Sequence, residues 1–243
     1  MRIPRVYSPQ SIAVADLIQL EPAPSHHLAS VLRMTTGQQV ILFNGYGGEY
    51  RGELVAVKKG RVTVQITAFD GIDRESPLPI HLAIGLSRGE RMDWIVQKAT
   101  ELGVAEITPL FTQRCEVKLN ADRLAKKTRH WQQITISACE QCQRNKLPII
   151  NTASPLPQLL STCSEDLKLV MHHRADTGLQ NLPQQNGSVC LLIGPEGGLS
   201  DQEINDATHQ GFQALAMGPR VLRTETAPVA AISILQALWG DLS

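Results

Sequence analysis

The sequence predicts an α/β protein in two parts, a small β-rich part followed by a part built on a parallel sheet. Short β-branched runs separated by turn sequences occupy the first part, and strands alternate with helices after residue 80. A polar stretch rich in proline and glycine, residues 70–79, separates the two patterns. We therefore expect two domains, residues 1–74 and residues 75–243.

The N-terminal part has the pattern of a small β-barrel. Three β-branched runs, residues 39–43, 49–57 and 61–68, are joined by glycine-containing turns at residues 44–48 and 58–60. Short strands at this spacing are typical of small barrels. Residues 28–34 predict a short helix ahead of the strands, closed by Gly37.

In the C-terminal part, apolar runs and amphipathic stretches alternate. The predicted strands are residues 80–86, 107–111, 167–171, 189–193 and 214–217. The predicted helices are residues 91–102, 120–144 and 200–211, followed by a last apolar helix with Pro228 in its first turn. This alternation predicts a parallel sheet covered on both faces, with ligands at the carboxyl ends of its strands. We expect the functional site in the loops after Ile193 and Met217.

Composition restricts the class of protein and of partner. The 243 residues include 23 basic and 23 acidic side chains, so the chain as a whole is not polybasic. Its charge is uneven, at +2 for residues 1–74, +3 for residues 75–150 and −5 for residues 151–243, which allows a polyanion to bind at one place. We find no targeting segment or membrane-spanning stretch, and the five cysteines suggest free thiols in a reducing compartment. We expect a cytoplasmic protein with no membrane partner.

Two loops concentrate the residues that can carry chemistry. Residues 194–200 follow a buried strand, contain three glycines and lead into a helix that Ser200 caps, but they match neither a P-loop nor a dinucleotide fingerprint. Glu196 disfavours a polyphosphate here and suits a ligand of cationic character, although a tight turn without a ligand is the alternative. Residues 217–227 carry two arginines and a glutamate beside an apolar helix. The alternative there is that Thr224 caps the helix and the charges are solvated.

Three further motifs have competing interpretations. Residues 85–89 match the G-x-S-x-G pattern of a hydrolase, with Ser87 as nucleophile and Asp176 and His209 downstream in the expected order. Against this, the motif follows the first strand of its domain, where hydrolase sheets place several strands before it. The Cys139–Cys142 pair lies within a predicted helix and has no second cysteine pair. The histidine pairs at residues 26–27 and 172–173 have no carboxylate or cysteine at metal-ligand spacing. We therefore expect no metal.

Six segments together resemble the ribosomal RNA small-subunit methyltransferase E family of the SPOUT superfamily. They are residues 3–7, 31–34, 97–104, 140–142, 193–198 and 218–227, and they extend over essentially the whole chain. The resemblance implies a PUA-like β-barrel joined to an α/β domain with a deep trefoil knot, and a homodimer. It also implies S-adenosylmethionine-dependent methylation of a uridine N3 in 16S ribosomal RNA, acting on the RNA or on the assembled small subunit. A non-catalytic RNA-binding protein is the other alternative.

The resemblance also places the cofactor, because in this family the two loops and the end of a neighbouring strand wrap S-adenosylmethionine. The implied cofactor-binding residues are Met171, His172, Gly194, Pro195, Glu196, Gly197, Gly198, Met217, Gly218, Leu222, Arg223 and Thr226. The two loops offer few charged groups, which makes Arg223 the candidate stabiliser of the uracil oxygens and Glu225 its partner or the base. The alternative is that both are structural.

Positive charge in the first two segments supplies candidate RNA contacts. These residues are Arg2, Arg5, Arg33, Arg88, Arg91, Arg114, Arg144 and Lys146. We expect the barrel to position the RNA through phosphate contacts while the second domain holds the cofactor and the target base.

Overall fold

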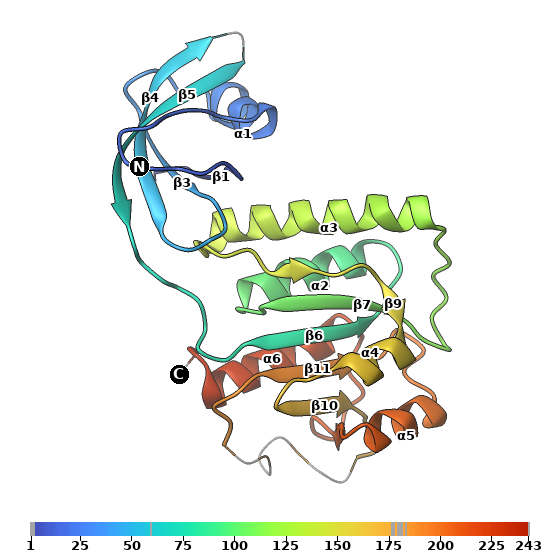
Figure 1. The fold of residues 1–243 in the computed structure, drawn as a ribbon. Coiled ribbons are helices and arrows are strands. Elements are labelled where there is room, and N and C mark those ends of the chain that lie inside the picture. The colour runs from blue at the N-terminus through green and yellow to red at the C-terminus, as the bar shows by residue number, and fades with distance from the viewer. Residues whose placement is uncertain (1–2, 59, 176–177, 179–181, 183, 243) are drawn as a thin grey trace. The chain divides into compact units, whose positions relative to one another are not determined.

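The computed structural model describes residues 3–58, 60–175, 178, 182 and 184–242, and the chain forms two compact units (Figure 1). Unit 1 comprises Met1–Glu75 and Cys139–Leu147, and unit 2 comprises Ser76–Ala138 and Pro148–Ser243. The sequence predicted one boundary after residue 74. In the structure, residues 139–147 also belong to the first unit.

Unit 1 is built on a five-stranded mixed sheet. Its strands are β1 (Arg5–Tyr7), β2 (Leu17–Gln19), β3 (Gln39–Phe43), β4 (Glu49–Lys58) and β5 (Arg61–Asp70), in the order β1-β3-β4-β5-β2. β1 runs parallel to β3, and the other pairs are antiparallel. The three predicted strands are confirmed as β3, β4 and β5. Their inward side chains, among them Leu42, Leu54 and Val64, are fully buried.

The predicted helix at residues 28–34 is wrong in position. The helical segment begins as α1 (Pro22–His26), continues as a π-helical turn (His27–Val31) and has ended before Arg33, whose φ of 53° is left-handed. Pro22 occupies the first turn. The backbone N–H groups of a first turn have no partner within the helix, so a proline there costs no hydrogen bond. The proline is therefore the start signal that the apolar pattern alone did not include.

Unit 2 contains the predicted parallel sheet. Its strands are β6 (Ile80–Gly85), β7 (Glu106–Phe111), β8 (Ile149–Ile150), β9 (Ser154–Pro155), β10 (Leu167–Met171), β11 (Val189–Ile193) and β12 (Gln213–Leu215). The order is β12-β10-β11-β6-β7-β8, with β9 also paired to β7, and every recorded pairing is parallel. β6 and β11 are buried along their whole length, as expected for strands covered on both faces.

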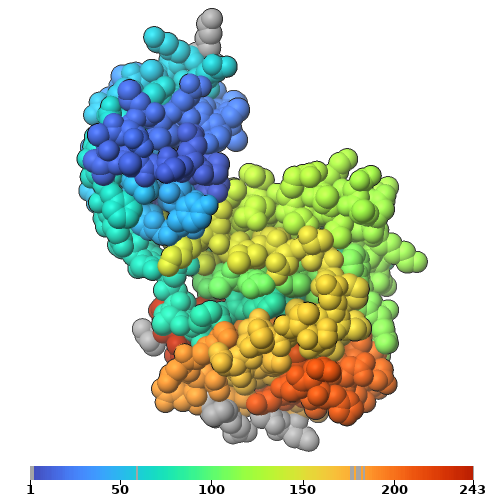
Figure 2. Space-filling view, in the orientation of Figure 1, coloured from blue at the N-terminus to red at the C-terminus, as the bar shows by residue number. Residues whose placement is uncertain are grey.

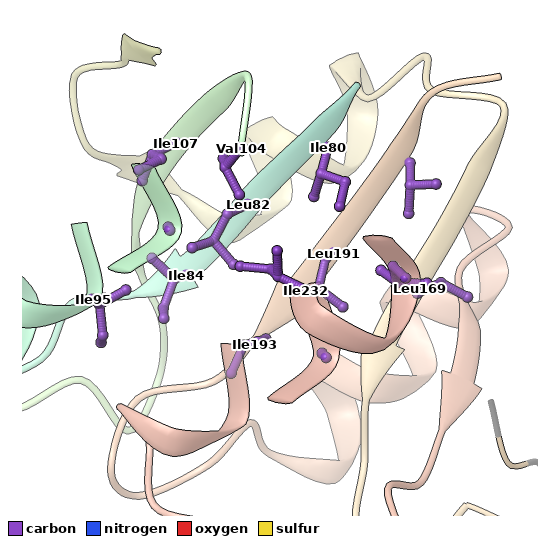
Figure 3. Packing of buried hydrophobic residues seen from close by; sticks show 14 of the residues in the cluster. Ile80, Leu82, Ile84, Ile95, Val104, Ile107, Leu169, Leu191, Ile193 and Ile232 are labelled. Atoms are coloured by element: carbon purple, nitrogen blue, oxygen red, sulfur yellow. The ribbon is translucent and has the colours of Figure 1, made fainter. Parts of the chain in front are cut away.

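Helices cover both faces of this sheet. They are α2 (Glu90–Glu101), α3 (Ala121–Cys142), α4 (Leu156–Thr162), α5 (Asp201–His209) and α6 (Thr226–Trp239). Leu82 and Leu191 pack with Ile95 of α2 and Ile232 of α6 on one face (Figure 3). On the other face, Leu192 packs with residues of α4 and α5, and these two helices form part of the surface seen in Figure 2.

The helix ends in unit 2 follow the predicted signals. Ser200 Oγ accepts a hydrogen bond from the Glu203 backbone at 3.2 Å, and Glu203 Oε2 accepts one from the Ser200 backbone at 2.8 Å, which completes the predicted capping box of α5. Pro228 is in the first turn of α6, as predicted. Among the described residues, no helix has the length and apolar character needed to cross a membrane.

Candidate active site

A cavity lies where three neighbouring strands of unit 2 end. β12, β10 and β11 are adjacent in the sheet and parallel, so the segments that follow Met171, Ile193 and Leu215 leave the sheet at the same edge. These segments surround a cavity of about 720 Å³, which is within the range of small-molecule sites. The two loops selected from the sequence therefore meet at one place.

Backbone rather than side chain forms much of the cavity wall at the first loop. A Cβ atom added to Gly194 would lie 2.7 Å from the Leu199 nitrogen and 2.9 Å from the Gly198 carbonyl carbon. Gly198 has a φ of 67° and donates a backbone hydrogen bond to the Pro195 carbonyl at 2.8 Å. The turn is thus closed so tightly that glycine is required at its start, and the chain can approach a ligand closely.

Arg114 fastens this turn from a different part of the chain. Its Nη1 donates to the carbonyl oxygens of Gly197 and Leu199, at 3.2 and 3.1 Å. Arg114 follows β7 and also lines the cavity. Arg114, expected from its charge to contact RNA, holds the glycine loop in the structure.

Two carboxylates at the cavity share one arginine. Glu196 Oε1 accepts hydrogen bonds from the Arg88 backbone at 3.1 Å and from Arg91 Nη1 at 2.9 Å, and Arg91 Nε lies 4.0 Å from Glu225 Oε2. Burial raises the pKa of Glu196, but these hydrogen bonds, together with its own backbone N–H and the Arg91 charge, outweigh burial and lower the pKa overall. Glu196 is therefore ionised at neutral pH.

The candidate catalytic residues Arg223 and Glu225 both line the cavity. Glu225 occupies the N-cap position of α6, where the helix dipole favours a negative charge. Arg223 is exposed, and its carbonyl accepts the backbone N–H groups of Thr226 and Ala227 at 2.9 Å each. Among the described residues, the recorded ion-pair partner of Glu225 is Arg91 rather than Arg223.

Residues 74–236 match the family described as RNA methyltransferase domain, and residues 22–67 match the family described as RNA methyltransferase PUA domain. The chain belongs to this RNA methyltransferase family. It is 38% identical to ribosomal RNA small subunit methyltransferase E of Buchnera aphidicola, with 100% of this chain and 99% of the relative covered.

Two solved structures are similar to this RNA methyltransferase over the full length of both chains. A Neisseria gonorrhoeae ribosomal RNA small subunit methyltransferase E bound to S-adenosylmethionine has 38% identity and a TM-score of 0.94. A Legionella pneumophila protein whose structure holds the same cofactor has 46% identity and a TM-score of 0.97. The expected combination of a PUA domain with a methyltransferase domain on a parallel sheet is thus confirmed.

The cavity of the methyltransferase unit fits S-adenosylmethionine in character. The ligand carries a sulfonium cation, an amine and a carboxylate but no phosphate, and the cavity presents glycine backbone, the carboxylates of Glu196 and Glu225 and five arginine side chains. Eleven of the twelve residues that the resemblance implied line it: Met171, His172, Gly194, Pro195, Glu196, Gly197, Gly198, Met217, Gly218, Leu222 and Arg223. Thr226 is the exception, since it is the first residue of α6 and does not line the cavity.

A histidine pair and an arginine follow β10 at the cavity. Burial lowers the pKa of His172, and the neighbouring His173 and Arg174 lower it further, while Asp201 acts in the opposite direction. The lowered pKa favours the neutral form of His172 at pH 7. The sequence analysis did not select His173 or Arg174, although both line the cavity, and their position directly after a strand end was the available signal.

The candidate RNA contacts have different surroundings. Arg5 and Arg144 are 7% and 5% exposed. Arg5 pairs with Glu49 and donates to Asn145 Oδ1 at 2.6 Å, while Arg144 pairs with Glu75. Both assignments to RNA are corrected, because buried and paired guanidinium groups cannot reach a phosphate. The sequence showed their charge but not their partners, which are distant along the chain.

Of the other candidate RNA contacts, one lies outside the described residues and the rest are at least partly exposed. Arg88 pairs with Glu116 at 2.8 Å and Lys146 pairs with Asp73 at 3.0 Å, each with a substantially exposed side chain. Arg33 is exposed, and Arg91 lines the cavity. Arg2 lies outside the described residues.

The hydrolase alternative is not supported by the surroundings of Ser87. Ser87 Oγ is buried and has no hydrogen-bond partner among the described residues, whereas a nucleophilic serine requires a base within reach. His209 is exposed at the end of α5. Asp176 lies outside the described residues.

Proposed function

We propose that this chain transfers the methyl group of S-adenosylmethionine to N3 of a uridine in 16S ribosomal RNA. The observation that carries the proposal is the cavity at the ends of β10, β11 and β12. Glycine backbone and two carboxylates form part of its wall. The chain also matches, over its full length, a ribosomal RNA small subunit methyltransferase E whose structure holds S-adenosylmethionine.

The chain's own residues have two tasks in this reaction. When bound, S-adenosylmethionine supplies an electrophilic methyl group on sulfur. Uridine N3 must lose its proton to attack, and Glu225, which lines the cavity 4.0 Å from Arg91, is the candidate acceptor. Arg223, exposed at the cavity, stabilises the negative charge that develops on the uracil oxygens. The competing arrangement is that both residues are structural and that the N3 proton passes to water or to a group of the RNA.

The proton and charge balance is simple. The N3–H proton goes to the base, the N3–C bond forms as the S–C bond breaks, and the sulfonium charge is lost as the thioether leaves. Before the reaction Arg91 lies 2.9 Å from Glu196 and 4.0 Å from Glu225.

The remaining expectations of the family resemblance belong to the same proposal. We propose a homodimer, supported by the exposed apolar side chains of Ile234 and Leu238 on α6 and of Val221 in the second loop. We also propose the deep trefoil knot, supported by the two loops lining one cavity. Unit 1 positions the RNA through phosphate contacts, for which Arg33 and Lys146 remain available.

The test is methyl transfer to RNA from a strain that lacks the enzyme. Purified protein is incubated with labelled S-adenosylmethionine and either naked 16S RNA or assembled small subunits, and mass spectrometry identifies the product. We expect N3-methyluridine on one of the two substrates. Label at another position, or unchanged N3-methyluridine in the deletion strain, would refute the assignment. Failure to bind S-adenosylmethionine in calorimetry would favour an RNA-binding protein without catalysis.

Variants separate the catalytic role from the structural one. Arg223→Ala and Glu225→Gln should each keep the dissociation constant of S-adenosylmethionine within a few-fold. Each should lower turnover at least about 10²-fold, the size of one lost transition-state donor. Loss of cofactor binding or of the dimer in either variant would show a structural role instead.

A further inference from the structure

A cluster of metal-ligand side chains lies at the opposite edge of the unit 2 sheet from the methyltransferase cavity. A ring nitrogen of His81, a carboxylate oxygen of Glu165 and the Cys190 sulfur all lie within 4.8 Å of one another. His81 is the second residue of β6 and Cys190 the second residue of β11, so both are at the amino ends of their strands. Nothing in the methyl-transfer reaction uses them.

Strand register brings these side chains together. Cys190 pairs directly with His81, and His81 pairs directly with Glu106 of β7. Side chains paired across parallel strands project from the same face, here the face that α4 and α5 cover. Glu165 reaches this row from the segment before β10, and its Oε1 pairs with His81 Nδ1. Lys168 is next in the row on β10 but does not line the adjoining cavity.

A fourth ligand atom is already beside the cluster. The Cys163 thiol donates a hydrogen bond to Glu165 Oε2 at 3.0 Å, and the Cys190 thiol donates one to the Cys163 sulfur. The four groups are two thiols, an imidazole and a carboxylate, a set that Zn²⁺ accepts.

Surrounding polar groups hold the histidine as metal-bound histidines are held. His81 Nε2 lies 2.8 Å from Thr108 Oγ1, which accepts from Asn151 Nδ2 at 2.7 Å. His81 is 8% exposed and Thr108 is 4% exposed. A hydrogen bond on one ring nitrogen fixes the orientation of the ring and leaves the other nitrogen to the metal.

An entry path also exists. A cavity of about 410 Å³ adjoins the cluster and is lined by His81, Cys163, Glu165 and Thr108, among others. Zinc bonds of about 2.0–2.3 Å place tetrahedral ligand atoms about 3.4–3.8 Å apart. The three cluster atoms, within 4.8 Å of one another, are close to that spacing.

We propose that His81, Cys163, Glu165 and Cys190 bind one zinc ion. The ion ties β6, β11 and the segment between α4 and β10 together, which makes the site structural. Binding displaces the two thiol protons to solvent. The sequence analysis predicted no metal because these four ligands are dispersed over residues 81–190, without any short-range spacing pattern.

The test measures the metal content of the full-length protein purified under reducing conditions without chelator. We expect close to one zinc per chain, and a Co²⁺-substituted form with a thiolate-to-cobalt charge-transfer band. Cys190→Ser and Glu165→Gln should lower zinc affinity at least about 100-fold, and Thr108→Val, which removes only the outer hydrogen bond, about 10–100-fold. Cys142→Ser, a half-buried cysteine of unit 1, is the matched control and should bind zinc as the unchanged protein does.

Two results would overturn the proposal. One is a zinc content far below one per chain, or the same zinc content in the unchanged protein and in Glu165→Gln. Glu165→Gln keeps the side-chain shape, so it still tests the site if Cys190→Ser fails to fold. The other is a Cys163–Cys190 disulfide in the non-reduced protein with no bound metal.

Discussion

Replacing Gly194 by alanine tests whether the first loop works through its backbone. Gly194 is not in the left-handed region, so alanine adds no backbone strain and the effect is purely steric. The added Cβ would lie 2.7 Å from the Leu199 nitrogen, whereas ordinary contacts begin at 3.4 Å. The neighbouring atoms are backbone, so the turn itself must move by about 0.7 Å.

The size of the effect follows from that displacement. Forcing one extra carbon into a packed site costs about 1–3 kcal/mol, which equals about 5–150-fold if it falls on the binding-competent form. A misplacement near 1 Å of positioning groups has a similar effect, about 10²-fold. We therefore expect S-adenosylmethionine to bind Gly194→Ala at least about fivefold more weakly.

Isothermal calorimetry with S-adenosylmethionine, together with thermal unfolding, measures the two effects separately. The control is Gly211→Ala, which follows α5, has a φ of 87° and has no atom within 4 Å of an added Cβ. It should lose about 1–2 kcal/mol of stability through left-handed strain while binding the cofactor normally. If folded Gly194→Ala binds the cofactor within twofold of the unchanged protein, the loop does not act through close backbone approach.

Three further predictions concern the charged residues. Glu49→Ala should lower the free energy of unfolding by about 3–5 kcal/mol, because it leaves Arg5 buried without its carboxylate; Asp70→Ala, at an exposed ion pair, should lower it by less than about 1 kcal/mol in the same denaturant titration. Hydrogen bonds and charge from its two arginines lower the pKa of Glu49 below 4.5, against the opposing effect of burial. Its contribution to stability is therefore complete above pH 4.5 and is lost as the pH falls through the lowered pKa, so Glu49→Gln should flatten the acid limb of the stability curve. Arg114→Ala removes two hydrogen bonds from the glycine loop and should weaken cofactor binding about tenfold in calorimetry.

Local signals predicted the elements that carry the site. The apolar runs of β10 and β11 and the capping box at Ser200 are complete within a few residues of sequence, and the structure contains each of them. The two loops could be selected for the same reason, because a strand end, glycines and a helix start follow one another directly. Their meeting at one cavity followed from parallel strands sharing an edge.

Long-range pairing could not be predicted from such signals. Arg91 reaches Glu196 across 105 residues, and Arg5 reaches Asn145 across 140. A sequence shows that an arginine is charged but not whether a carboxylate will be buried beside it. The strands β8 and β9, with two residues each, likewise depend on pairing with β7 rather than on any pattern of their own.

The net charge of a segment does not show where its charged side chains gather in the fold. Residues 151–243 are acidic overall and contain four basic side chains, yet three of these, Arg174, Arg220 and Arg223, line the cavity. Arg91 and Arg114 join them from the preceding segment. Glu196 and Glu225 are held next to Arg91, and among the described residues no ion pair is recorded for Arg174, Arg220 or Arg223. If the proposed function holds, we expect an RNA strand to be attracted to the rim of this cavity.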